Sequence, residues 1–112
     1  MLSKLKIIPE ILSGIIPGNV YHYEAFKAYD KYIVWAEDSE GESLEADNYK
    51  AEQSIQGTID YFTKQEYDEN VDKIQAALVA NRISFYLNSV QYESPDEGYA
   101  GYIHYEWVWE VS

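Results

Sequence analysis

The segment Tyr99–Val111 constrains the fold more than any other part of the chain, because large side chains alternate along its whole length. A period of two predicts an extended strand whose two faces differ. One face would carry Ile103, Tyr105, Trp107, Trp109 and Val111, and the other Tyr102, His104, Glu106, Val108 and Glu110. A strand needs partners for its backbone groups, so the chain is expected to build a sheet.

Further segments have the composition or periodicity of regular structure. In chain order they are a helix over Leu2–Leu12, strands over Tyr32–Glu37 and Ser54–Lys64, a helix over Tyr67–Ala80 and a strand over Ile83–Tyr92. Short connections favour antiparallel pairing. The sequence therefore predicts one α+β domain, residues 1–112: a four-stranded antiparallel sheet with two helices packed on one face, in the order α-β-β-α-β-β. Residues 20–30 fit neither a helix nor a strand clearly.

The first helix carries start and stop signals together with an obstacle. Ser3 is a candidate N-cap, and Gly14 is a candidate end of the helix. Pro9 lies between them, and an interior proline removes a hydrogen bond and clashes with the preceding turn. We therefore expect the helix either to kink at Pro9 or to begin close to it.

Two local signals mark the second half of the chain. Thr63 and Glu66 have the spacing of a capping box ahead of the second helix. In the strand over Ile83–Tyr92, strict alternation would place Phe85 and Val90 on opposite faces of the sheet. Both can face inward only if one extra residue is inserted between them. The sequence therefore predicts a β-bulge near Asn88-Ser89.

Acidic residues outnumber basic ones by 20 to 8, which gives the chain a net charge of −12. Such a chain repels phosphate backbones and anionic membrane surfaces, so we expect neither sequence-specific nucleic-acid binding nor membrane contact. No apolar run reaches the ~18 residues that a membrane span needs. An acidic, mobile loop is expected around residues 37–52, and its acidic side chains include Glu37, Asp38, Glu40, Glu42, Glu45 and Asp47.

The chemistry-bearing residues do not indicate catalysis. The chain has no cysteine, which excludes thiolate metal sites and cysteine nucleophiles. His22 with Glu24, and His104 with Glu106, would each share a strand face, but zinc needs three or four ligands in one place. No phosphate-binding loop, dinucleotide fingerprint or serine-nucleophile motif is present. We expect no enzyme activity, no cofactor and no metal, and a hydrolase has no positive signal.

The aromatic content indicates a contact surface. Twelve tyrosines and three tryptophans exceed what a core of this size needs. Tyrosine and tryptophan are favoured at protein interfaces. The predicted interface residues lie on the final strand: Tyr102, His104, Trp107 and Trp109. The acidic charge leaves a second class of function open, a small acidic protein-binding module that imitates nucleic acid.

The order of elements and several short motifs resemble a known family. The motifs are the Pro-Gly loop Ile15-Ile16-Pro17-Gly18-Asn19, the strand YIVWAED, the strand GTIDYFTK, the helix EYDENVDKIQAALVANRI and the closing strand GYIHYEWVWEV. Together they resemble the tail-terminator proteins (also called tail-completion or head–tail joining proteins) of long-tailed phages and prophages. The likeness covers nearly the whole chain. The acidic segment and Pro9 depart from the family pattern.

The resemblance implies a structural virion protein with a small sheet flanked by helices. Members form rings, typically hexamers, that cap the finished tail tube and present the surface to which the head attaches. It implies as partners further copies of the chain, the tail tube protein and a head-completion or connector protein, with assembly in the bacterial host cytoplasm and a final place in the virion tail. The acidic residues from Glu37 to Asp47 would then face the channel or the adjoining ring. A different head–tail connector or a minor tail component is the alternative.

Overall fold

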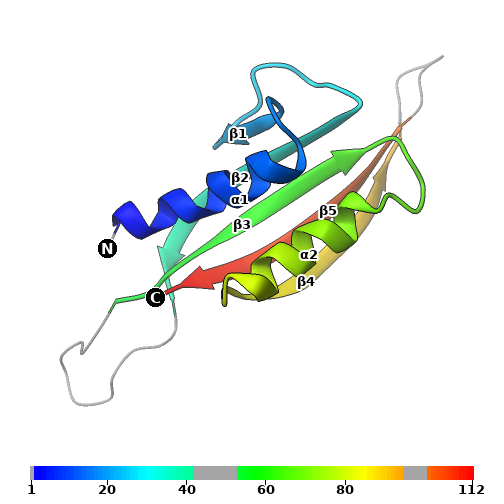
Figure 1. The fold of residues 1–112 in the computed structure, drawn as a ribbon. Helices are drawn as coiled ribbons and strands as arrows, with labels where there is room; N and C mark the ends of the chain where they lie inside the picture. Colours follow the sequence, from blue (N-terminus) through cyan, green and yellow to red (C-terminus); the bar gives the residue numbers. More distant parts are fainter. Residues whose placement is uncertain (1, 42–52, 95–100) are drawn as a thin grey trace.

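The computed structural model describes residues 2–41, 53–94 and 101–112. The described residues form a five-stranded sheet with the strand order β1-β2-β3-β5-β4, together with two α-helices (Figure 1). The strands are β1 (Val20–His22), β2 (Lys31–Glu40), β3 (Ile55–Thr63), β4 (Ser84–Glu93) and β5 (Tyr102–Val111). A 3-10 helix, η1 (Leu2–Lys6), leads directly into α1 (Ile7–Ile15), and α2 (Asn70–Ala80) joins β3 to β4.

The α+β class is confirmed, but the sheet differs from the prediction by one strand. β1 pairs with β2 in parallel, from Val20 opposite Ile33 to His22 opposite Trp35, so the sheet is mixed. The other three pairings are antiparallel, as expected. A strand this short has too few residues to show a period of two, which is why the sequence pattern did not reveal it. β1 ends at His22, and the next residue, Tyr23, has a φ of 74°, in the left-handed region.

The register of the sheet sets the faces of the strands. β3 and β5 pair without a break from Ile55 opposite Val111 to Thr63 opposite Ile103. The predicted bulge in β4 is confirmed, since the register with β5 shifts between Leu87 and Ser89. The inserted residue keeps one set of β4 side chains on the same face as the β5 tryptophans: Phe85, Leu87, Val90 and Tyr92.

Both helices cover the same face of the sheet, as predicted (Figure 1). Their apolar stripes and the inward side chains of the sheet form one buried cluster. Its largest fully buried members are Trp107, Trp109, Tyr61, Ile8, Leu12, Ile33, Ile59, Ile74 and Leu78. Within the described residues no helix lies on the opposite face of the sheet, which we call the open face. None of the described helices has both the length and the apolar character needed to cross a bilayer.

Pro9 is accommodated because α1 begins only at Ile7. Proline in the first turn of a helix loses no hydrogen bond, since the N–H groups there have no partner within the helix. Ser3 lies inside the preceding 3-10 helix, so its predicted N-cap role is wrong. Gly14 lies in the last turn of α1, and the helix ends one residue later, where the Ile16 N–H donates to the Leu12 carbonyl at 3.0 Å.

α2 begins at Asn70 and not at the predicted Tyr67. Tyr67 has a φ of 54°, which is incompatible with a right-handed helix, and its side chain is 96% exposed. Asp68 takes the capping role, because its carboxylate accepts the Asn70 N–H at 2.9 Å. The predicted capping box is therefore wrong: the Thr63 hydroxyl accepts the Gln65 N–H and donates to Asp68.

The acidic segment begins as a strand and not as a loop. β2 extends to Glu40 because β3 continues to pair with it, with Glu37 opposite Gly57 and Glu40 opposite Ile55. A second register shift lies in this stretch, between Glu37 and Ser39. The predicted loop residues Glu42, Glu45 and Asp47 lie outside the described residues.

Candidate functional site

Four rings gather at one end of the open face, and we call them the open-face cluster: Tyr32, Phe62, Tyr102 and His104. The Phe62 ring stacks between the rings of Tyr32 and His104, with its centroid 4.6 Å from that of Tyr32 and 4.2 Å from that of His104. Tyr102 meets Tyr32 edge to face at 5.6 Å, and its hydroxyl donates to the Tyr29 carbonyl at 2.6 Å. All four side chains are half-buried. The cluster offers a rigid aromatic surface without a helix above it.

His104 joins the open-face cluster to two carboxylates. Its Nε2 lies 2.7 Å from Asp60 Oδ1 on β3, and its Nδ1 lies 3.0 Å from Glu93 Oε2 on β4. Burial raises the pKa of Asp60 above its usual value, the contact with His104 opposes that effect, and the nearby Glu106 adds to it. His104 therefore holds three strands together through charge-assisted contacts, since β5 lies between the other two.

The two tryptophans predicted as interface residues belong to the core. Trp107 and Trp109 have no exposed surface, because β5 turns them toward the helices. The Trp107 indole N–H donates to Gln75 of α2 at 3.0 Å. A side chain that is fully covered within its own chain presents nothing to a partner, so the prediction is corrected for these two residues. Tyr102 and His104 do lie on the open face, and their role as interface residues stays a prediction.

The acidic end of β2 is engaged with β1. Glu37 accepts a hydrogen bond from the Tyr23 hydroxyl, and its second oxygen lies 2.8 Å from His22 Nε2. Burial would raise the pKa of Glu37, but these hydrogen bonds and the imidazole hold it below its usual value. Glu40 accepts a hydrogen bond from Gln53 at 3.1 Å, and Asp38 is exposed. Glu37 therefore serves the structure, whereas Asp38 adds negative charge to the surface.

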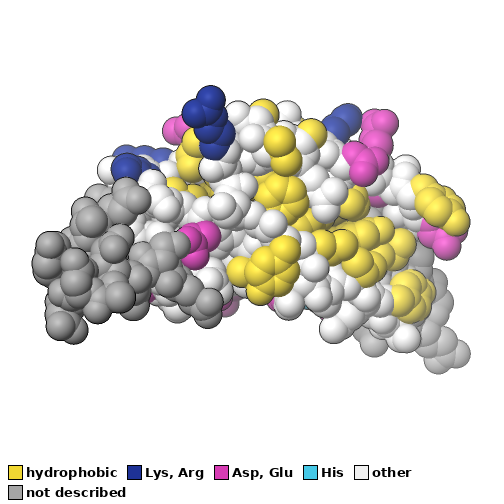
Figure 2. Space-filling view, turned by 90° about the horizontal axis from the view of Figure 1, so that it is seen from below, with side chains coloured by type: hydrophobic (Ala, Val, Ile, Leu, Met, Phe, Trp, Pro, Cys, Tyr) yellow, Lys and Arg dark blue, Asp and Glu magenta, His cyan; other side chains and the backbone are white. Residues whose placement is uncertain are grey.

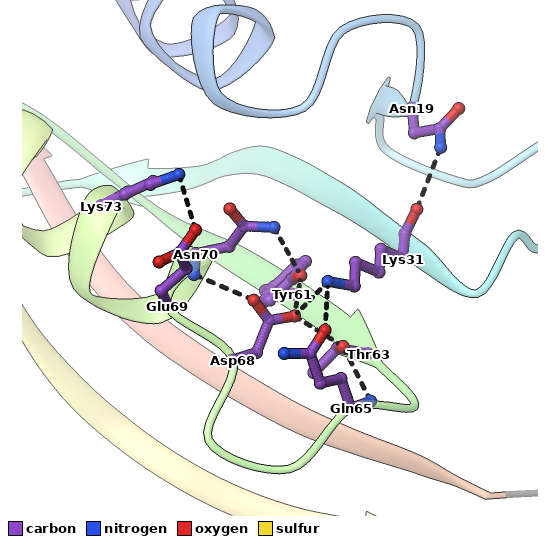
Figure 3. Close-up of polar contacts among 9 residues, drawn as sticks. All are labelled: Asn19, Lys31, Tyr61, Thr63, Gln65, Asp68, Glu69, Asn70 and Lys73. Carbon is purple, nitrogen blue, oxygen red and sulfur yellow. Dashed lines mark hydrogen bonds and ion pairs between the residues drawn. The ribbon is translucent and has the colours of Figure 1, made fainter.

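The buried carboxylate of Asp68 is the centre of a polar network at the start of α2 (Figure 3). It accepts hydrogen bonds from the Tyr61 hydroxyl at 2.5 Å and the Thr63 hydroxyl at 2.7 Å, and Lys31 Nζ lies 3.3 Å away. Burial would raise its pKa, but the bonds from Tyr61, the Asn70 N–H, Thr63 and Lys31 hold it below its usual value. Burial beside this carboxylate raises the pKa of Tyr61. Each acceptor is used within the chain, so the network is structural.

β4 forms one edge of the sheet, and most of its residues are exposed. It pairs only with β5, and no charged residue lies between Ser84 and Tyr92. Its exposed apolar side chains, which we call the β4 patch, are Leu87, Val90 and Tyr92 on the helix side of the sheet and Tyr86 on the open face. Seen from below, apolar side chains gather along this side of the molecule (Figure 2). Sheet edges of this kind pair with other chains unless charge, proline or a covering element prevents it.

At the opposite edge of the sheet, β1 and acidic side chains protect β2, and the segment between β1 and β2 exposes aromatic rings. β1 covers part of β2, and the remainder of β2 carries Asp38 and Glu40. The segment that connects the two strands exposes three rings, which we call the aromatic loop: Tyr23, Phe26 and Tyr29. Phe26 is 87% exposed and touches Tyr21 only edge to face, with 6.2 Å between the ring centroids.

The histidines do not form a metal centre. His22 stacks on Trp35 on the helix side of the sheet, whereas His104 lies on the open face, so the two predicted His–Glu pairs stay apart. Among the described residues, no group of three or more histidine, aspartate and glutamate side chains is placed to hold a metal ion. Sequence reasoning missed the Asp68 network, although an aspartate two residues before a helix is a capping signal. It also missed the β4 patch, because nothing in a single strand reveals that it lies at an edge.

Compared with protein-family models and with curated protein sequences, the chain matches none of them. The geometry of the sheet, its open face and its edges therefore carries the functional argument.

Proposed function

We propose that this chain is a structural protein of a phage or prophage tail, a tail terminator whose copies form a ring at the head-proximal end of the tail and join the tail to the head. The single observation that carries the proposal is the β4 patch. An apolar, charge-free sheet edge is left exposed in a chain whose net charge is −12. Exposed apolar surface on such an edge is typical of a protein that assembles.

The fold supports this proposal at a coarser level. The resemblance implies a small sheet flanked by helices, and the described residues form a sheet with two helices on one face. The open face adds a second surface. Its half-buried rings, Tyr102 and His104 among them, suit contact with a tail tube protein or a connector. A hexamer is the copy number that the resemblance implies.

The negative charge has a physical role in a ring of this kind. A channel that passes DNA must not retain it, and acidic walls repel phosphates. Asp38 and Glu40 at the end of β2, together with Glu42, Glu45 and Asp47 of the sequence, are the residues that we propose line the channel or face the adjoining ring. Glu37 is less available for such contacts, because its two oxygens are held by Tyr23 and His22.

The alternatives receive less support from the described residues. A nucleic-acid mimic needs carboxylates spaced like phosphates on one surface, but Asp60 and Glu93 are both engaged by His104, and Asp68 is buried. A connector or minor tail component would use the same sheet edge with another partner. The proposed function is not enzymatic.

The proposal is tested by size-exclusion chromatography with light scattering over a range of concentrations, with and without tail tubes from the phage or prophage that encodes the chain. We expect either rings in solution or a monomer that assembles on tube ends, where electron microscopy would show it. A chain that stays monomeric beside tubes and binds a basic host protein, or turns over a small molecule, would overturn the proposal.

A further inference from the structure

We infer that the ring is closed by a head-to-tail contact in which the β4 patch of one copy receives the aromatic loop of the next copy. This inference rests on the proposed function, because it names the surfaces by which copies of the chain meet. The β4 patch is Tyr86, Leu87, Val90 and Tyr92, and the aromatic loop contributes Tyr23, Phe26 and Tyr29.

The positions of the two surfaces fit a ring. β4 is the last strand at one edge of the sheet, and the loop between β1 and β2 lies at the other edge (Figure 1). A ring needs two different patches on opposite sides of each copy, so that every subunit contacts a neighbour on each side. A contact between two β4 strands would instead stop at two copies and leave Phe26 in water.

Charge selects a second copy as the occupant of the β4 patch. Two chains that each carry −12 repel each other, so they meet most favourably where charge is absent. β4 has no charged residue from Ser84 to Tyr92. In the aromatic loop, Lys27 lies 4.9 Å from the Tyr29 ring centroid, and this cation offsets part of the charge of Glu24 and Asp30. A basic partner would be drawn to the acidic surfaces and not to this edge.

The exposed side chains of the two surfaces supply about two-thirds of the area that one stable contact needs. The exposed side chains of the two surfaces amount to about 800 Å² together, at ~200 Å² for a fully exposed aromatic residue. Stable specific interfaces begin at about 1,200 Å² in total, and the backbone of the β4 edge and its flanking residues would supply the remainder. Phe26 is the natural anchor, because a ring that is 87% exposed has the most surface to lose.

The contact is tested by thiol cross-linking. Because the chain has no cysteine of its own, only the introduced thiols can react. Val90→Cys places a thiol in the β4 patch, and Ala28→Cys places one in the aromatic loop while keeping the Phe26 ring. Both positions are exposed, so the fold should persist, and circular dichroism checks this. A short bis-maleimide tolerates the geometry that a disulfide would not. The control mixture is Ser13→Cys with Asp72→Cys, two exposed helix positions that report random collision.

The mixture of Val90→Cys and Ala28→Cys should give covalent dimers about tenfold or more faster than the control mixture, because bound surfaces hold the thiols at high effective concentration. Each variant alone should remain at the control rate, and a chain carrying both cysteines should give a ladder that ends at the ring. Rapid dimers from Val90→Cys alone, or a mixture no faster than the control, would overturn the inference. If wild-type chains still form rings on tail tubes in that case, the proposed function stands and only the contact is wrong.

Discussion

The Tyr61 hydroxyl donates a hydrogen bond to the Asp68 carboxylate at 2.5 Å and thereby ties the central strand β3 to the start of α2. The same carboxylate accepts from Thr63 and caps the helix at Asn70, while Lys31 of β2 lies 3.3 Å from it. One acidic side chain thus connects two strands and a helix.

Replacing Asp68 should destabilise the fold strongly. Asp68→Ala leaves the buried hydroxyls of Tyr61 and Thr63 without their acceptor and removes the ion pair with Lys31, which keeps its hydrogen bond to Gln65. We expect a loss of about 3 kcal/mol in the free energy of unfolding. Urea unfolding followed by circular dichroism measures this loss. Asp72→Ala is the matched control, because Asp72 lies on the exposed side of the same helix, and it should change the free energy far less.

The Asp68 contribution should also depend on pH. The folded state holds its pKa below the usual value, so the stabilisation is present at neutral pH and is lost as the pH falls through that lowered pKa. The difference between wild type and Asp68→Asn should therefore shrink on acidification. A difference that grew toward acid would contradict the assignment of the charged form.

Asp60 should behave in the opposite way. Burial raises the pKa of Asp60 in the folded state, so the folded protein favours the protonated carboxyl. This contribution to the free energy of unfolding is present at low pH and is lost as the pH rises through the raised pKa. At neutral pH the ionised, partly buried carboxylate therefore opposes folding. Asp60→Asn keeps an acceptor near His104 and removes the buried charge, so the free energy of unfolding at neutral pH should stay equal or rise. Below about pH 4 the advantage over wild type should disappear, because the carboxyl is then protonated in both states. A loss of stability at neutral pH would show that the contact with His104 outweighs burial.

Gly57 should not tolerate a side chain. A Cβ at this position would lie 2.1 Å from the Ala36 carbonyl oxygen and 2.5 Å from the Trp109 ring, and the backbone atom cannot move without breaking the β2–β3 pairing. Gly57→Ala should lower the free energy of unfolding by about 2 kcal/mol or more, as overpacked cores do. Gly14→Ala is the control, since nothing lies within 4 Å of its added Cβ, and it should be neutral or stabilising. Thermal unfolding of the two variants side by side measures the contrast.

The acidic residues at the end of β2 and beyond should affect DNA passage and leave folding intact. The triple variant Glu40→Gln, Glu42→Gln and Glu45→Gln should assemble like wild type but release DNA more slowly from reconstituted particles, because phosphates are repelled less. Fluorescence of a DNA-binding dye on ejection measures the rate. Ejection at the wild-type rate would count against an acidic channel. Glu66→Gln, a single exposed position outside the segment, controls for nonspecific effects of lost charge.

The sequence was most informative where a period extends over many residues. The alternation along Tyr102–Val111 predicted the strand and its two faces correctly, and the phase change near Asn88 predicted the bulge. Amphipathic spacing likewise predicted the two helices, and the order of the elements predicted that both cover one face. These patterns are local, so one strand or helix contains all of the information that defines them.

The remaining features depend on neighbours that a single segment does not reveal. A period of two separates Trp107 from His104, but only the sheet order and the helices decide that the tryptophans are the covered set. The candidate interface was the hardest feature to predict, because Leu87 and Val90 are exposed only as a result of the edge position of β4 in the sheet. β1 was missed because a three-residue parallel strand has no detectable period.

The sheet order also has a consequence for how the chain is made. β5 follows β3 and β4 in the chain, yet it lies between them in the sheet. Until the ribosome has synthesised residues 102–111, β3 and β4 lack the strand that pairs with both of them, and α2 lacks the tryptophans on which it packs. This part of the sheet can therefore close only after β5 has been made.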